Sequence, residues 1–167
     1  ADKEVVLAAL KNDGSALKYA DESLKKDKEI VLIAVKDRGI AFEYADKKLR
    51  ADKEVVLEAV KHDLVGAALE HADKKLRADK EVVLAALKQH SSTFEYADKK
   101  LKADKEFILA SVKQNGWVLE HVDDSLKKDK EIVLAAVKQD GGALQYADDI
   151  FKKDEEIVLE AVKSSGY

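Results

Sequence analysis

A ten-residue block that recurs seven times constrains the fold of this chain more than any other feature of its sequence. The block first occurs at residues 2–11, where it reads DKEVVLAALK. Its opening aspartate returns at Asp27, Asp52, Asp79, Asp104, Asp129 and Asp154, at intervals of 25 residues with one exception of 27. A fixed period of this length is typical of short helical units that stack into a linear array. We therefore expect an all-α fold, an α-solenoid of tandem 25-residue two-helix repeats that forms a right-handed superhelix.

The repeats divide the chain, taken as a single repeat domain over residues 1–167, into six complete units and a terminal helix. The units are 2–26, 27–51, 52–78, 79–103, 104–128 and 129–153, and the terminal helix is 154–167. We number the positions of each unit from its aspartate. The third unit is two residues longer because of an insertion within 63–67, between its two helices. An insertion at that place lengthens a loop and leaves the helices intact.

Positions 2 to 11 of each unit predict the first helix. Aspartate at position 1 is a good N-cap, and glutamate at position 3 and lysine at position 10 complement the helix dipole. Glycine often follows at position 13, where we expect a left-handed residue that ends the helix. These glycines are Gly14, Gly39, Gly116 and Gly141. Positions 4, 5, 6, 8 and 9 are apolar and cover an arc of about 200°, which indicates a helix packed between neighbours on both sides.

The second half of each unit predicts another short helix from about position 14. Every complete unit has an aspartate at position 20, at Asp21, Asp46, Asp73, Asp98, Asp123 and Asp148. Either the helix runs through this aspartate, or it breaks there and the aspartate caps a final short turn. We favour one short helix, kinked at the aspartate. Such a helix would carry the ion pairs Glu43–Lys47, Glu70–Lys74 and Glu95–Lys99.

The repeat resembles a known family of tandem helical repeats. The stretches that carry the resemblance best are QNGW at residues 114–117 and ALQYA at residues 143–147, each following a copy of the DKEVVLAAVK pattern. They resemble the family called domain of unknown function 4116. The resemblance covers the whole chain and implies short α-helical repeats, and it implies no activity. The chain departs from the family in its aspartate at position 20, where we expect serine, and in two histidines at tyrosine positions.

Composition excludes several classes of function. The 30 basic and 34 acidic residues alternate along the chain, which argues against a nucleic-acid-binding or membrane-binding surface. No apolar run approaches the ~20 residues that a membrane-spanning helix needs, and no signal-peptide pattern is visible. We therefore expect a cytoplasmic protein. The absence of cysteine, proline and methionine is also typical of an idealised or engineered repeat protein.

The candidate catalytic and metal-binding residues are explained better by structural roles. His71 and His121 occupy position 18, which other units fill with tyrosine, and we expect half-buried aromatic side chains there. His62 and His90 lie in the loops between helices, and no set of ligands converges at the spacing that zinc requires. The two columns of aspartates have local roles as caps and ion-pair partners. We expect no cofactor, no metal and no enzymatic activity.

The residues that differ between units are the candidates for a binding surface. Trp117, Ile40, Leu64 and Val65 are apolar members of the loop edge between the two helices, and Ile33 is an apolar member of position 7. Variable residues on an invariant frame are typical of the binding surface of a solenoid. The alternative is that Trp117 and Ile40 pack on the preceding first helix.

These patterns lead to two hypotheses about function. The first is a non-catalytic scaffold that binds a protein or peptide through the loop edge or through position 7. The second is an engineered or structural repeat module with no natural ligand. The terminal helix 154–167 has no following unit to cover its apolar residues, so we expect an exposed patch there and self-association through it.

Overall fold

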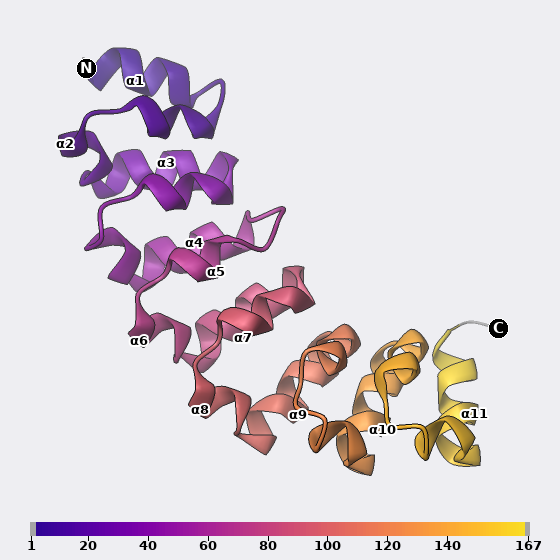
Figure 1. Cartoon of the computed structure of the whole chain (residues 1–167). Coiled ribbons are helices and arrows are strands. Elements are labelled where there is room, and N and C mark those ends of the chain that lie inside the picture. Colours follow the sequence, from indigo (N-terminus) through magenta and orange to yellow (C-terminus); the bar gives the residue numbers. More distant parts are fainter. Residues whose placement is uncertain (1–2, 166–167) are drawn as a thin grey trace. The chain divides into compact units, whose positions relative to one another are not determined.

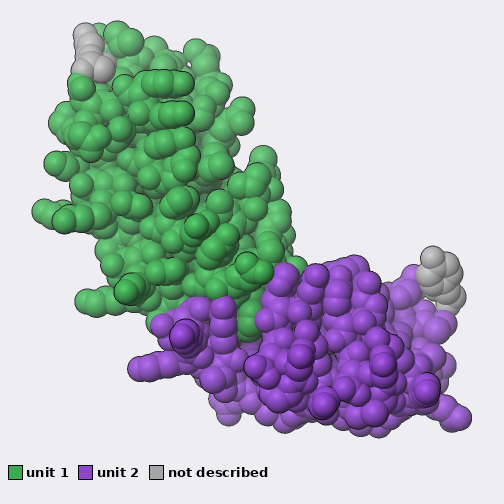
Figure 2. Space-filling view, viewed as in Figure 1, with its two compact units in different colours: residues 1–96 green, residues 97–167 purple. Residues whose placement is uncertain are grey.

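The computed structural model describes residues 3–165, and within that range it contains helices and connecting turns but no strand (Figure 1). The predicted cap Asp2 and the last residues, Gly166 and Tyr167, lie outside the described residues. The chain divides into two compact units, residues 1–96 and 97–167 (Figure 2). In each of them the repeats follow one another in chain order. The predicted all-α repeat architecture is therefore confirmed.

The first helix of each repeat begins at position 2 and ends near position 11, as predicted. In the first compact unit these helices are α1 (Lys3–Leu10), α3 (Lys28–Asp37), α4 (Lys53–Lys61) and α7 (Lys80–Gln89). In the second they are α9 (Lys105–Gln114), α10 (Lys130–Gln139) and α11 (Glu155–Ser164). The aspartate at position 1 caps the helix through its side chain. Asp79, for example, accepts hydrogen bonds from the backbone N–H groups of Glu81 and Val82 at 3.0 and 3.2 Å.

The second half of each repeat is not one kinked helix, so the favoured prediction was wrong. It begins with a 3₁₀ helix in five repeats: η1 (Gly14–Tyr19), η2 (Gly39–Tyr44), η4 (Ser91–Tyr96), η5 (Gly116–Glu120) and η7 (Gly141–Tyr146). The third repeat has the short helix α5 (Ala68–His71) at this place. A separate turn follows, as α2 (Glu22–Lys25), η3 (Leu49–Ala51), α6 (Lys74–Arg77), α8 (Lys99–Lys102), η6 (Leu126–Lys128) and η8 (Phe151–Lys153).

The break lies at positions 19 and 20, where the backbone is extended. Ala20 has ψ of 152° and Asp21 has ψ of 154°, far from the helical value. The aspartate at position 20 then caps the final turn, which is the alternative that the sequence left open. Asp73 accepts from the N–H of Lys75 at 2.9 Å.

This break removes the predicted ion pairs between positions 17 and 21. The acidic residue is the second-to-last residue of one element and the lysine lies beyond the extended link, so the two do not share a helix. The final turns instead hold pairs three residues apart. These are Glu22–Lys25 at 3.0 Å, Asp124–Lys127 at 3.1 Å and Asp149–Lys152 at 2.9 Å.

The glycines at position 13 do not have the left-handed conformation that we predicted. Among the described residues, Gly66 alone has a positive φ, of 79°. What these glycines share is a close contact with an alanine carbonyl oxygen of the next repeat, and Gly39 is an example. Its N–H donates to the carbonyl oxygen of His62 at 3.0 Å, and a Cβ there would collide with the carbonyl oxygen of Ala59 and lie 2.6 Å from the nitrogen of Asp63. Glycine is therefore favoured at this position because the backbone of the next repeat approaches it closely.

The core runs through each compact unit as a continuous layer, because the first helices are buried on two sides. In α4, Val55, Val56, Ala59 and Val60 are buried, whereas Leu57 at position 6 is only half-buried, so the buried arc is narrower than the apolar arc predicted. The second halves add large buried side chains to the same layer. These are Leu17, Phe42, Leu69 and Phe94 in the first compact unit, and Leu119 in the second.

Candidate functional site

A groove in the first compact unit brings together three of the predicted binding residues. Ile40, Leu64 and Val65 line it with Arg38, Gly39 and His62, and its volume is about 200 Å³. Leu64 is 84% exposed and Val65 is 63% exposed, although both are large apolar side chains. The groove exists because the insertion in the third repeat lengthens the loop after α4 and places these two side chains beside η2.

The insertion loop is anchored at several points along its backbone. The carboxylate of Asp63 is buried and accepts from the N–H groups of Val65 and Ala68 at 3.1 and 2.6 Å. The carbonyl oxygen of Asp63 is 3.0 Å from Nε2 of His90, on the next repeat. Gly66, with its positive φ, makes the turn at the end of the loop. These bonds hold Leu64 and Val65 outward on a fixed backbone.

The polar side chains that line the groove, Arg38 and His62, are already paired with carboxylates of the chain itself. Nε of Arg38 lies 3.0 Å from Oδ1 of Asp13, and Nε2 of His62 lies 2.9 Å from Oε1 of Glu58. The hydrogen bonds from Ser15, with a smaller contribution from Arg38, lower the pKa of Asp13. The rim therefore offers little net charge to a ligand, and the groove favours a neutral apolar group.

Trp117 belongs to the second compact unit and is held by the repeat that follows its own. Its indole Nε1–H donates to Oδ2 of Asp140 at 2.7 Å. Its ring meets that of Tyr146 edge to face, with the centroids 5.7 Å apart and an interplanar angle of 69°. This hydrogen bond and this ring contact both reach forward along the chain, to the repeat that follows. Ile33 lies half-buried on α3 and does not line the groove.

The histidines at position 18 are half-buried, as predicted. Nε2 of His71 is 3.9 Å from Oε2 of Glu43, on the preceding repeat. Among residues 3–165, no group of three or more His, Cys, Asp and Glu side chains is placed to hold a metal ion. None of the helices that the structure describes is long and apolar enough to cross a membrane.

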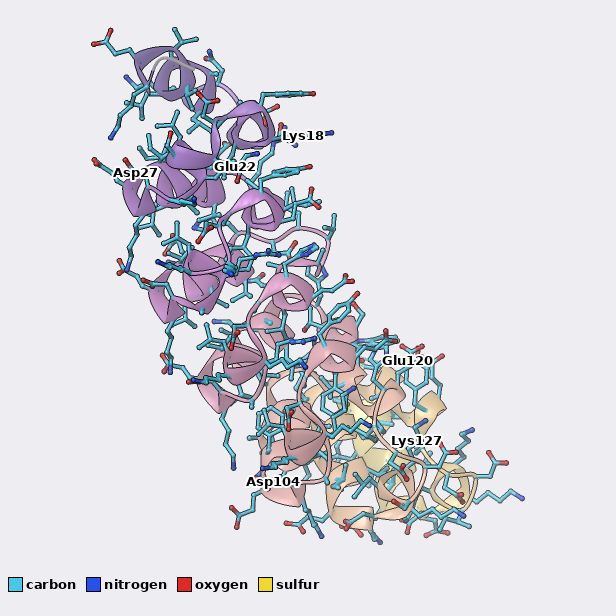
Figure 3. The ribbon with its side chains drawn as sticks, turned by 60° about the vertical axis from the view of Figure 1, so that its left-hand side comes forward. Lys18, Glu22, Asp27, Asp104, Glu120 and Lys127 are labelled. Carbon is cyan, nitrogen blue, oxygen red and sulfur yellow. The ribbon has the colours of Figure 1, made fainter. Side chains whose placement is uncertain are left out.

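A ladder of ion pairs links successive repeats, and sequence reasoning missed it. The lysine at position 2 reaches the aspartate at position 1 of the next repeat, and in most cases the glutamate at position 3 as well. Nζ of Lys53 is 2.7 Å from Oδ2 of Asp79 and 2.8 Å from Oε2 of Glu81. The same aspartate pairs occur at Lys3–Asp27, Lys28–Asp52, Lys105–Asp129 and Lys130–Asp154. Figure 3 shows Asp27, a member of this ladder, on one edge of the stack and Lys18, which is not a member, on the opposite edge.

The ladder shifts the pKa values of both the lysine and the aspartate that it joins. The hydrogen bonds to Asp129 and then Glu131 raise the pKa of Lys105. The hydrogen bond from Lys105 lowers the pKa of Asp129, and backbone N–H groups add to this effect against the opposing effect of burial. The signal in the sequence was the lysine at position 2, which is present in the first six copies and replaced by Glu155 in the last. This ladder therefore stabilises the stacking of successive repeats.

The repeats of this chain match a known protein family along the whole array. A family model described as "Domain of unknown function (DUF4116)" matches residues 2–50, 52–102, 104–151 and 129–167. The chain belongs to this family. The DUF4116 matches confirm the resemblance that the repeat sequence suggested, and they run in tandem along the chain. No curated protein and no solved structure gave a significant match.

Proposed function

We propose that this DUF4116 chain is a non-catalytic scaffold that binds a protein or peptide through the groove of Ile40, Leu64 and Val65. The observation that carries the proposal is the anchored insertion loop, which holds two large apolar side chains in water. Exposed apolar side chains that gather at one place are typical of an interaction site. A backbone already fixed before binding lowers the entropic cost of association.

The size and charge of the groove indicate what occupies it. Pockets for small molecules typically enclose about 300–1,000 Å³, whereas this groove encloses about 200 Å³. It therefore accepts a single side chain of a larger partner. Since Arg38 and His62 are paired with carboxylates of the chain itself, the side chain that fits is neutral and apolar. We infer a partner segment anchored by one leucine, isoleucine or phenylalanine.

A peptide-display selection tests this function. A library of random peptides is selected on the wild-type chain after depletion on the variant Leu64→Asp/Val65→Asp. Both side chains are exposed, so the variant should unfold at the same denaturant concentration as the wild type. The selected peptides should share an apolar anchor, and the double variant should bind them at least about tenfold more weakly, a difference of about 1.4 kcal/mol.

Ile150→Asp provides the matched control, because Ile150 is also an exposed aliphatic residue but lies in the second compact unit. This control should bind the selected peptides as the wild type does. Peptides that bind all three proteins equally would count against the groove. In that case Trp117 and Ile33, which remain predicted partner contacts, become the next sites to vary.

A structural module without a ligand is the second candidate. The observation that favours it is the ladder of ion pairs, in which a lysine of one repeat binds a carboxylate of the next repeat. Under this alternative the display selection yields no peptide that depends on Leu64 and Val65. Whether the repeat is natural or engineered does not change that test.

A further inference from the structure

The final turns of successive repeats lie side by side along one edge of the first compact unit, where Figure 1 labels α2 and α6. The N–H of Asp46 donates to the carbonyl oxygen of Lys25 at 3.0 Å, which places η3 against the end of α2. The N–H of Asp73 donates in the same way to the carbonyl oxygen of Arg50 at 2.9 Å, which places α6 against η3. The three turns therefore form a continuous edge.

These turns differ from one another in charge. Position 21 is acidic in the first, fifth and sixth repeats and pairs there with the lysine at position 24, as Glu22 does with Lys25 at 3.0 Å. In the second, third and fourth repeats, positions 21, 22 and 24 are all basic. Like charges three residues apart destabilise a helical turn, so these basic residues are present in spite of their effect on stability. In the first compact unit they are Lys47, Lys48 and Arg50 around η3, and Lys74, Lys75 and Arg77 in α6.

A hollow where α2 meets η3 collects unpaired positive charge. It encloses about 460 Å³ and is lined by Lys26, Asp46, Lys47, Lys48 and Leu49. Within residues 3–165, the amino groups of these three lysines make no ion pair, in contrast to the lysines of the ladder. Asp46 accepts at Oδ1 from the N–H of Lys48 at 2.9 Å. Three positive charges thus accompany one carboxylate in the hollow, although the whole chain has a net charge of −4.

We propose that this edge binds an extended acidic segment of another protein through Lys26, Lys47, Lys48, Lys74 and Lys75. Lys74 and Lys75 are exposed one repeat beyond the hollow, so the basic surface is longer than a single small anion. Packed helices lie about 8–10 Å apart, and an extended chain rises ~3.3 Å per residue. Carboxylates about three residues apart in the partner therefore reach lysines on successive turns.

Two features of the edge favour an acidic protein segment over a nucleic acid. None of the residues that line the hollow is aromatic, so the hollow supplies no platform on which bases stack. An aspartate also precedes the lysines of each turn, at Asp46 and Asp73. A polypeptide can place an uncharged residue opposite this aspartate, whereas a nucleic acid carries a phosphate at every nucleotide.

This edge is separate from the groove of Ile40, Leu64 and Val65. The final turns lead directly into the first residues of the first helices, whereas the groove lies beyond the last residues of α3 and α4. A helix of about ten residues is about 15 Å long. The edge therefore goes beyond the proposed function, and either site can be disproved without the other.

Fluorescence anisotropy with a labelled peptide tests the edge. The probe has about twelve residues, with glutamate at every third position and serine elsewhere. It should bind the wild type at low ionic strength and be released at about 1 M salt, where the screening length is ~3 Å. Lys47→Glu/Lys74→Glu should bind it at least about tenfold more weakly. The same variant should unfold at an equal or higher urea concentration, because it restores the kind of pair that Glu22 makes with Lys25.

Lys36→Glu/Lys88→Glu is the matched control, because it makes the same change of charge at exposed lysines in the last turns of α3 and α7. It should bind the probe as the wild type does. A wild type that does not bind the probe, or a control that loses binding as strongly as the edge variant, would overturn the proposal. An oligodeoxynucleotide of the same net charge that binds more tightly than the probe would assign the edge to nucleic acid and would overturn the proposal as well.

Discussion

At the scale of single residues, the aspartate at position 1 performs two tasks with its two oxygens. Oδ1 of Asp79 accepts from backbone N–H groups of its own helix, and Oδ2 accepts from Lys53 of the preceding repeat. One residue thus starts a helix and ties it to its neighbour. This double role explains why the block keeps both an aspartate at position 1 and a lysine at position 2.

Replacing Asp79 with alanine should lower the free energy of unfolding by about 1 kcal/mol or somewhat more, because an N-cap is lost. The bond from Lys53 is lost as well, so the effect should exceed that of Lys53→Met. Urea unfolding followed by circular dichroism measures the difference. Asp124→Ala is a suitable control, since that carboxylate is exposed and pairs only within its own turn. Equal effects of the two alanine variants would contradict the double role.

The ladder also predicts how stability changes with pH. The pKa of Asp129 is lower in the folded chain than its unfolded value of about 3.9, chiefly because of Lys105. Its contribution to stability is therefore fully present above that unfolded value and is lost as the pH falls through the lowered pKa. Acid unfolding between about pH 5 and pH 2 should be less steep in Lys105→Met than in the wild type. An unchanged acid transition would argue that the bridge contributes nothing.

These two tasks were not equally predictable from the sequence. The cap was predictable because its donors lie two and three residues further along the chain. The bridge joins residues 24 apart, as in Lys28–Asp52, so it depends on how one repeat is placed on the next. The lysines at position 2 are visible in the sequence, but no local pattern indicates that their side chains reach the aspartate of the next repeat.

At the scale of the helical elements, contacts between repeats override local preference. The N–H of Asp46 donates to the carbonyl oxygen of Lys25 at 3.0 Å, and that of Asp73 donates to the carbonyl oxygen of Arg50 at 2.9 Å. In a continuous second helix this N–H would bond within its own repeat. In the structure this N–H bonds to a carbonyl oxygen of the preceding repeat instead, so the second half of the repeat breaks at position 20. The aspartate itself is compatible with either structure, which is why the sequence left both open.

Close approach at position 13 gives a prediction at the same scale. Gly39→Ala should destabilise the chain by about 1–3 kcal/mol, because the new Cβ overlaps the backbone of the next repeat at Ala59 and Asp63. Ser91 fills position 13 in the fourth repeat and already carries a Cβ, so Ser91→Ala should have little effect. Thermal unfolding of the two variants compares them directly. A tolerated Gly39→Ala would mean that the repeats can separate at this point without cost.

At the scale of the whole molecule, stability and function are assigned to different residues. The invariant positions of the repeat are used in capping, burial and bridging between copies. The groove depends on the one place in the described chain where a repeat is lengthened, the loop 62–67. Sequence reasoning identified Ile40, Leu64 and Val65 because they vary between repeats. It could not identify Arg38 and His62 as their neighbours, because the course of the inserted loop depends on Asp63 and His90.

The most direct test of the account is an NMR titration of the ¹⁵N-labelled chain with a peptide from the display selection. We predict that the amide shifts that change with peptide concentration belong to residues 38–40 and 62–66, with few changes in the second compact unit. The same titration of Leu64→Asp/Val65→Asp should show none of these changes. Shifts that instead centre on Trp117, or that persist in the double variant, would contradict the assignment of the groove as the binding site.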